Sequence, residues 1–197
     1  MHGYEIDSQE RRQVHFVLAF AGIGLAMLLD QWAKQYSIAL PFWISMPSPF
    51  GIYVGLLSLF DHKLWKFSLL RWVFGIQTPV ISGEWAGTLQ TRHDGFSQPH
   101  SCRVQITQRW RRLCIILETD KSRSHSLVGS ISVEAGKGMS LTYHYQNEPK
   151  GNAPSTMNIH YGSCELIMDA DGKSLTGNYF SGRGRSEHGQ ISLSKSP

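Results

Sequence analysis

An uncharged apolar segment near the start of the chain constrains its fold more than any other feature. Residues 14–29 (VHFVLAFAGIGLAMLL) carry no formal charge. With Gln31 and Trp32 the segment reaches about 20 residues, enough for an α-helix to cross the hydrocarbon core of a bilayer. A secretory signal peptide is the main alternative, because Arg11 and Arg12 supply its cationic start. The sequence MLLDQWAKQY is a poor cleavage site, since bulky and charged residues stand where small ones are needed, so a spanning helix is favoured.

A second uncharged segment, residues 35–60, is interrupted by Pro41, Pro47 and Pro49. In one interpretation Ser48 is an N-cap and Pro49 the first helical residue, and the helix runs through FGIYVGLLSLF and on through DHKLWKFSLLRW. In the other, a helix spans from about Ile38 with a kink at the prolines. Both interpretations remain open at this point.

The cations around these segments predict how they are oriented. Arg11 and Arg12 precede the first segment, and Lys63, Lys66 and Arg71 follow the second. The connecting loop holds only Lys34 beside Asp30. The positive-inside rule therefore predicts a two-helix transmembrane region over residues 14–73, with both termini in the cytoplasm and a loose tail over residues 1–13. Residues 61–73 repeat apolar residues at helical spacing between cations, which suits a helix end or an interfacial helix.

Composition limits the remaining functions. The 197 residues carry a net charge of +4, which leaves room for one domain after the helices. The three cysteines lack metal-ligand spacing, and the nine histidines include no HExxH motif. No P-loop, GxSxG motif or nucleophile–base pair is visible at motif spacing. We therefore expect no catalytic residues, no metal, no cofactor and no DNA or RNA partner, and we expect reduced thiols.

From Val80 onward the hydrophobic period changes to two, which is typical of β-strands. Eight short strands separated by turn-rich pieces predict an all-β domain over residues 76–197, an eight-stranded antiparallel up-and-down (lipocalin-like) β-barrel. Met157, Ile159 and Tyr161 are out of phase with Cys164 and Leu166, so we expect a bulge near residues 162–163. The expected strands are ISGEWAGTLQT, SCRVQITQRW, LCIILET, SHSLVGSISVE, MSLTYHYQN, STMNIHYGSCELIMD, SLTGNYFSG and GQISLSK.

Up-and-down topology gathers alternate strand ends at one mouth, where serines, tyrosines and arginines converge. Arginines in a glycine-flanked turn can hold a phosphodiester, and tyrosines can stack on nucleobases. Each group also has a structural alternative. The arginines could lie in an ordinary solvated turn, the tyrosines could fill the barrel, the serines and the asparagine could be exposed loop residues, and the histidine could be structural. Trp85 is expected to be a core residue at the barrel base. The candidate ligand-binding residues are Ser122, Ser124, Ser126, Tyr143, Tyr145, Asn147, His160, Tyr179, Arg183 and Arg185.

The order of several motifs gives the chain a resemblance to a known family. The motifs are PSP, FDHKLWK, GEWAG, YHYQNEPK, MNIHYG and GNYFSGRGR, after two apolar segments. They resemble the two-transmembrane β-barrel effectors of bacterial CBASS (cyclic-oligonucleotide-based antiphage signalling) operons. The resemblance implies a receptor in the bacterial inner membrane. A cyclic dinucleotide from a partner nucleotidyltransferase (CD-NTase) would bind the barrel, and oligomerisation would disrupt the membrane in abortive infection. The alternative is a membrane-tethered lipocalin-like carrier or scaffold for an apolar small ligand.

Overall fold

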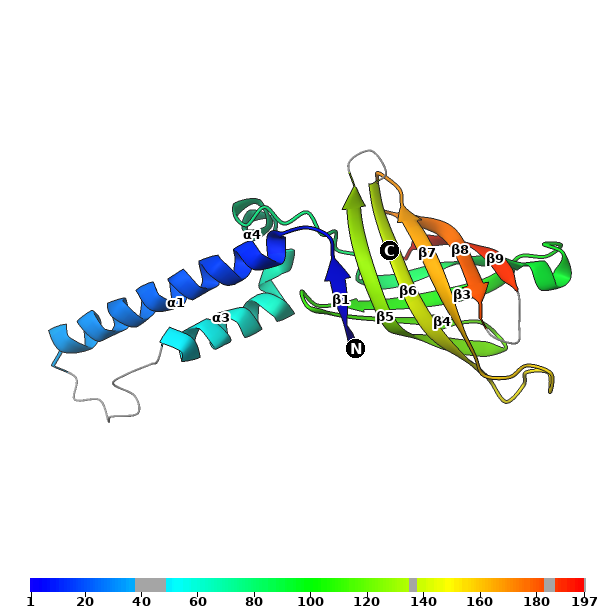
Figure 1. Cartoon of the computed structure of the whole chain (residues 1–197), viewed down its shortest axis with the longest axis horizontal. Coiled ribbons are helices and arrows are strands. Elements are labelled where there is room, and N and C mark those ends of the chain that lie inside the picture. The colour runs from blue at the N-terminus through cyan, green and yellow to red at the C-terminus, as the bar shows by residue number, and fades with distance from the viewer. Residues whose placement is uncertain (38–48, 135–137, 183–186, 197) are drawn as a thin grey trace. The chain divides into compact units, whose positions relative to one another are not determined.

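The computed structural model describes residues 1–37, 49–134, 138–182 and 187–196. The chain forms two compact units (Figure 1). One unit is helical and comprises Ser8–Gln77, and the other is a β-unit made of Met1–Asp7 together with Thr78–Pro197.

The helical unit contains α1 (Glu10–Gln35), α3 (Pro49–His62), a 3-10 turn at Leu64–Lys66 and α4 (Ser68–Val73). Glu10 in the first turn of α1 and Lys34 in its last turn both complement the helix dipole. The two long helices approach closely at Gly22, where an added Cβ would lie 3.0 Å from the Pro49 carbonyl oxygen. His15 Nδ1 and the Tyr53 hydroxyl, 2.8 Å apart, add a hydrogen bond between α1 and α3.

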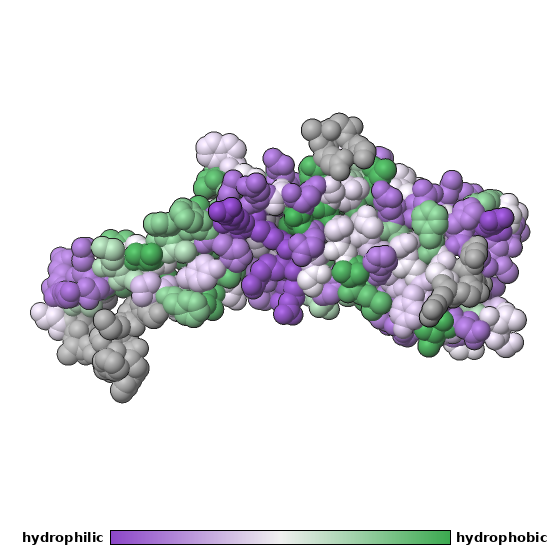
Figure 2. All heavy atoms as spheres, in the orientation of Figure 1, coloured by the Kyte–Doolittle hydropathy of each residue, from purple (hydrophilic) through white to green (hydrophobic). Residues whose placement is uncertain are grey.

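Within the described residues one helix, α1, is long and apolar enough to cross a membrane. Its apolar side chains remain largely exposed, for example Phe16 at 65% and Leu28 at 62%. In Figure 2 hydrophobic residues run along α1 and α3 on the face shown. A core helix of a soluble protein would bury such side chains, so the exposure of α1 agrees with contact to lipid.

The second helix does not continue unbroken to residue 72, as one interpretation of the sequence expected. α3 ends at His62, and the chain then turns through the 3-10 segment into α4. The first break lies at Lys63, with φ −137° and ψ −44°, and a second lies at Phe67, whose backbone is extended with φ −72° and ψ 129°. The other interpretation, a start near Ile38, concerns a segment outside the described residues.

The β-unit is a closed barrel in which the strands from β2 to β9 each pair with the next along the chain. β9 then pairs with β2, antiparallel like the other neighbours, and closes the circuit. Closure leaves no exposed strand edge. The eight strands that follow the helices are β2 (Gly83–Thr91), β3 (His100–Gln108), β4 (Arg112–Glu118), β5 (Ser122–Glu134), β6 (Gly138–Pro149), β7 (His160–Met168), β8 (Ser174–Ser181) and β9 (His188–Lys195).

A ninth strand, β1 (His2–Ile6), corrects two predictions from the sequence. Among the described residues the sheet has nine strands rather than eight, and residues 2–6 form one of them rather than part of a loose tail. β4 and β5 pair directly at only three positions, between Ile116–Glu118 and Arg123–His125. Where they separate, β1 fills the opening, antiparallel to β4 and parallel to β5 (Figure 1). Tyr4 and Ile6 point into the core from this strand.

The predicted bulge is also in a different place. β6 and β7 pair in unbroken register from Asn147–His160 to Met139–Met168, so residues 162–163 carry no bulge. The apparent change of phase arises because β7 begins only at His160, which leaves Met157 and Ile159 outside the strand. The register shift lies in β5, between Ser126 and Val128.

Apolar side chains fill the end of the barrel where β2 begins, which we call the near end. Trp85 is fully buried there, as predicted for a core residue, and its indole Nε1–H donates to the Ile81 carbonyl at 3.0 Å. Leu141, Leu166 and Leu175 are fully buried in the same core. The opposite end, where β2 ends and β5 begins, is the far end and has a different interior.

Candidate ligand-binding site

At the far end, buried polar side chains gather on β5 and β6, whereas β2, β3, β4 and β9 still contribute apolar side chains such as Leu89 and Leu117. Ser122, Ser124 and Ser126 alternate along the start of β5 with exposures of 9%, 6% and 7%, and Asn147 on β6 is 7% exposed. Ser124 lies directly opposite Asn147, and Ser126 opposite Tyr145. The alternation that places leucines inside the near end therefore places hydroxyls and an amide inside the far end. The structure brings these predicted residues together on two adjacent strands.

Hydrogen bonds divide this polar set in two. The Ser122 hydroxyl lies 3.1 Å from the Thr119 hydroxyl. The Ser126 hydroxyl oxygen accepts a hydrogen bond from the Ile115 amide N–H at 2.9 Å, and it lies 2.7 Å from His2 Nε2. Within the described residues, the structure shows no hydrogen-bond partner for the side chains of Ser124 and Asn147. Buried polar groups are nearly always paired with protein, water or ligand, so these two side chains are the candidates for contact with a ligand.

Two tyrosines of the site are positioned by glycines on the neighbouring strand. Tyr145 lies opposite Gly162, and a Cβ added to that glycine would come within 2.4 Å of the tyrosine hydroxyl oxygen. Tyr179 lies opposite Gly189 in the same way, with its Cε1 2.4 Å from the added Cβ. Each ring therefore occupies space that any other residue on the facing strand would fill. This pairing holds the rings in place and resembles the aromatic covering of sheet glycines.

Tyr143 and His160 complete the described part of the predicted site. Tyr143 is 3% exposed, and its ring centroid lies 6.2 Å from that of Tyr145. His160 pairs with Asn147 across the strands, and its Nδ1 lies 3.1 Å from the Asn158 carbonyl oxygen. Eight of the ten predicted residues thus come from β5 to β8. Arg183 and Arg185 lie outside the described residues.

The described interior of the barrel holds no buried charge. Burial raises the pKa of the Cys164 thiol to about 12 and that of the Cys102 thiol to about 11. Burial also raises the pKa of the Tyr143 and Tyr145 phenols above their ordinary value. All four groups are neutral near pH 7, so the interior offers hydrogen bonds and ring faces. A counter-charge for an anionic ligand would have to come from the rim.

These shifts predict that the barrel loses stability in alkali. The Cys164 thiol ionises near pH 9 in an unfolded chain but near pH 12 in the barrel. Between these values the unfolded state binds fewer protons, so the free energy of unfolding falls as pH rises, and it is level below pH 9. We expect the melting temperature to decline above pH 9, with a shallower slope in Cys164→Ser, measured by circular dichroism. An identical slope in the variant would contradict this account.

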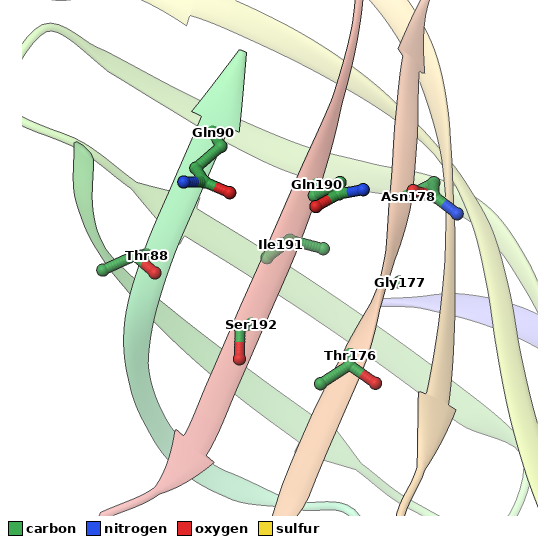
Figure 3. A pocket seen from close by; sticks show the side chains of 8 residues that line it. All are labelled: Thr88, Gln90, Thr176, Gly177, Asn178, Gln190, Ile191 and Ser192. Carbon is green, nitrogen blue, oxygen red and sulfur yellow. The ribbon is translucent and has the colours of Figure 1, made fainter. Parts of the chain in front are cut away.

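A groove on the outer face of the barrel contains none of the predicted residues. It has a volume of about 330 Å³ and lies over β2, β9 and β8 (Figure 3). Its lining is uncharged and polar, because Gln90, Gln190 and Asn178 lie side by side across the three strands. The outward parity of these residues is visible in the sequence. Their assembly into a groove depends on the β2–β9 closure, which no local pattern reveals.

His2, which was not among the predicted residues, also lies beside the site. Its contact with Ser126 joins β1 to the polar part of β5 across 124 positions of sequence. The only local signal is the short alternation HGYEI, which is too brief to predict a strand.

A closed barrel of about this many strands either fills its interior with side chains or holds one small ligand. The polar side chains without partners at the far end favour the second arrangement. The family model "Cap15, cyclic dinucleotide receptor domain" matches residues 76–195. A "CD-NTase-associated protein 15" from Yersinia aleksiciae is 35% identical over 181 residues, covering 90% of this chain and 85% of that protein. A protein of the same description from Staphylococcus schleiferi is 32% identical over 123 residues, 62% of this chain and 64% of that protein.

The chain therefore belongs to the Cap15 family of cyclic dinucleotide receptor domains. This membership confirms the resemblance to CBASS effectors that the sequence motifs indicate.

Proposed function

We propose that this chain is a CBASS antiphage effector whose barrel binds a cyclic dinucleotide at the far mouth. Binding would promote oligomerisation of a two-helix transmembrane hairpin and disrupt the bacterial inner membrane, with the barrel in the cytoplasm. Family membership supports the class of ligand. The chain would act as a receptor and catalyse no reaction.

The buried pair Ser124 and Asn147 carries the placement of the ligand. These side chains lie opposite each other in the polar mouth with no partner within the described residues. A hydroxyl can donate to a phosphate oxygen, and an amide can pair with the edge of a nucleobase. Tyr145 and Tyr179, held over glycines, offer ring faces for stacking. Lipocalins are up-and-down barrels that hold one small ligand, and we propose that this barrel holds its ligand in a similar way.

The phosphates of the ligand need positive charge that the described interior lacks. We propose that Arg183 and Arg185 supply it from the rim, because guanidinium groups bind phosphate oxygens in pairs. Lys150, whose Nζ donates to the Thr119 carbonyl at 2.7 Å, lies at the same end of the barrel and would add to the positive potential.

Strand β1 offers a route from the ligand site to the membrane helix. His2 contacts Ser126 in the mouth, and at the other end of the strand Ser132 donates to the Asp7 carboxylate. Only Ser8 and Gln9 separate Asp7 from the first residue of α1. A ligand that displaces His2 from Ser126 would therefore remove a contact that fixes β1 in the barrel. β1 is joined to α1 by a short stretch of chain, so the change could reach the helix. Such coupling requires different ligand affinities for the resting and assembled states.

The full chain in lipid nanodiscs tests the proposal. We expect one or more members of a panel of cyclic dinucleotides to bind with micromolar or tighter affinity in titration calorimetry, and an apolar fluorescent probe not to bind. We expect the binding member to convert monomers into larger species in cross-linking. If the folded chain binds no member of the panel, the receptor function is wrong. Binding of the apolar probe alone would favour the carrier alternative.

A further inference from the structure

The helical unit contains an amphipathic cleft that the proposed function does not use. It has a volume of about 870 Å³ and lies between the first two turns of α1 and the end of α4. Its polar side includes Gln9, Arg12 and Gln13, and its apolar side includes Phe16, Val17 and Trp72. All of these residues belong to the helical unit.

The apolar side of the cleft is open to the surroundings. Trp72 is 82% exposed, Phe16 65% and Val73 58%, and α4 buries no residue at all. An exposed tryptophan beside an apolar surface is typical of the interface between hydrocarbon and lipid headgroups. These side chains suit an acyl chain, because nothing in the helical unit covers them.

The charge of the same region is positive at its surface. Residues 8–17 and 60–77 contain five cations (Arg11, Arg12, Lys63, Lys66 and Arg71) and two carboxylates, Glu10 and Asp61. Both carboxylates are buried, at 3% and 5% exposure. One oxygen of Glu10 accepts the Gln77 amide at 2.6 Å. The exposed charge is therefore cationic, and Arg12 is the cation that lines the cleft.

We propose that this cleft binds one anionic phospholipid, with its acyl chain along Phe16, Val17 and Trp72 and its phosphate at Arg12. The inference rests on the proposed membrane location of the helical unit. Gln9 and Gln13 supply amide groups for the glycerol and ester oxygens. A zwitterionic lipid would fill the apolar side equally well but would not satisfy the excess of cations, so the cleft selects for negative headgroups.

The test compares Arg12→Gln with Lys34→Gln, which removes one exposed cation from the opposite end of the same helix. Each full-length variant is placed in nanodiscs of equal parts phosphatidylglycerol and phosphatidylcholine, and the lipids retained after mild extraction are counted by native mass spectrometry. We expect wild type and Lys34→Gln to retain phosphatidylglycerol preferentially. In Arg12→Gln the ratio of retained phosphatidylglycerol to phosphatidylcholine should fall about fivefold. This is close to the effect of one basic residue at an anionic membrane surface. Trp72→Ala should lower retention of both lipids.

Equal preference in Arg12→Gln and wild type, or equal loss in Arg12→Gln and Lys34→Gln, would overturn the proposal. Cyclic dinucleotide binding, measured on the same preparations, is expected to be unchanged in Arg12→Gln. If wild type retains phosphatidylglycerol but binds no cyclic dinucleotide, the receptor function fails and the lipid site stands. If wild type fails to enter nanodiscs, both the membrane location and the lipid site are wrong.

Discussion

Asn147→Asp is expected to weaken cyclic dinucleotide binding by about 100-fold or more. The substitution keeps the shape of the side chain but replaces an amide donor with a carboxylate, at a position 7% exposed in the mouth. Leaving a nucleobase edge unpaired in the buried mouth costs about 1–3 kcal/mol, and repulsion between the carboxylate and the phosphates adds to this cost. Every 1.4 kcal/mol is a factor of ten in affinity. Titration of the full chain in nanodiscs measures the change.

Asn178→Asp is the matched control for this prediction. Asn178 is exposed on the outer face of β8, in the outer groove, so the same chemical change should leave affinity within about twofold. Asn147→Leu removes the amide without adding charge and should lose about tenfold or more. If Asn178→Asp abolishes binding and Asn147→Asp does not, the ligand occupies the outer groove. Melting temperatures of all three variants show whether a loss reflects misfolding.

Tyr4→Ala is expected to destabilise the barrel by about 3 kcal/mol, at the lower end of the range for truncating a large buried aromatic side chain. Tyr4 is 2% exposed, packs in the barrel core and places its hydroxyl 3.3 Å from the Arg109 carbonyl oxygen. For a domain of this size the melting temperature should fall by about 10 °C. Chemical denaturation followed by the fluorescence of the buried tryptophans gives the free energy of unfolding.

Glu5→Ala on the same strand serves as the control. Glu5 is exposed, so its removal should change stability by less than about 0.5 kcal/mol. A loss in both variants would mean that pairing of the strand, rather than burial of Tyr4, decides stability. No loss in Tyr4→Ala would mean that β1 does not contribute to the barrel in solution.

A fragment that starts at residue 76 should likewise be less stable than the full chain, because β4 and β5 would be left apart where β1 inserts.

Much of the β-unit could be predicted because its strands obey a simple alternation. The parity that places Leu113, Leu141 and Leu175 on one face is a local property, and their burial follows it. The polar mouth could be predicted for the same reason, since Ser124 and Asn147 continue the inward parity at the ends of β5 and β6. Arg183 and Arg185 remain predictions, because they lie outside the described residues.

The features that the sequence predicted in the wrong place depend on the conformation of the folded chain rather than on local sequence pattern. Residues 2–6 form a strand because β4 and β5 separate far away in sequence and leave an opening of the right size. The bulge at Ser126–Val128 depends on the register between β5 and β6. The helix ends at His62 even though apolar periodicity continues through residue 73, because Lys63 leaves the helical conformation with φ −137° and ψ −44°. Phe67 is then extended between the 3-10 turn and α4.

The sequence by itself determined the apolar helix and the number and order of the strands after it, because both follow from periodicity and turn chemistry within short segments. Its motifs also determined the resemblance to CBASS effectors. Only the tertiary structure decided that β1 completes the barrel. It also decided that Ser122 and Ser126 have hydrogen-bond partners, whereas Ser124 and Asn147 have none within the described residues. The physical reason is that hydrogen-bond partners are set by which strands meet in space. Residues as distant as His2 and Ser126 meet only when the barrel closes.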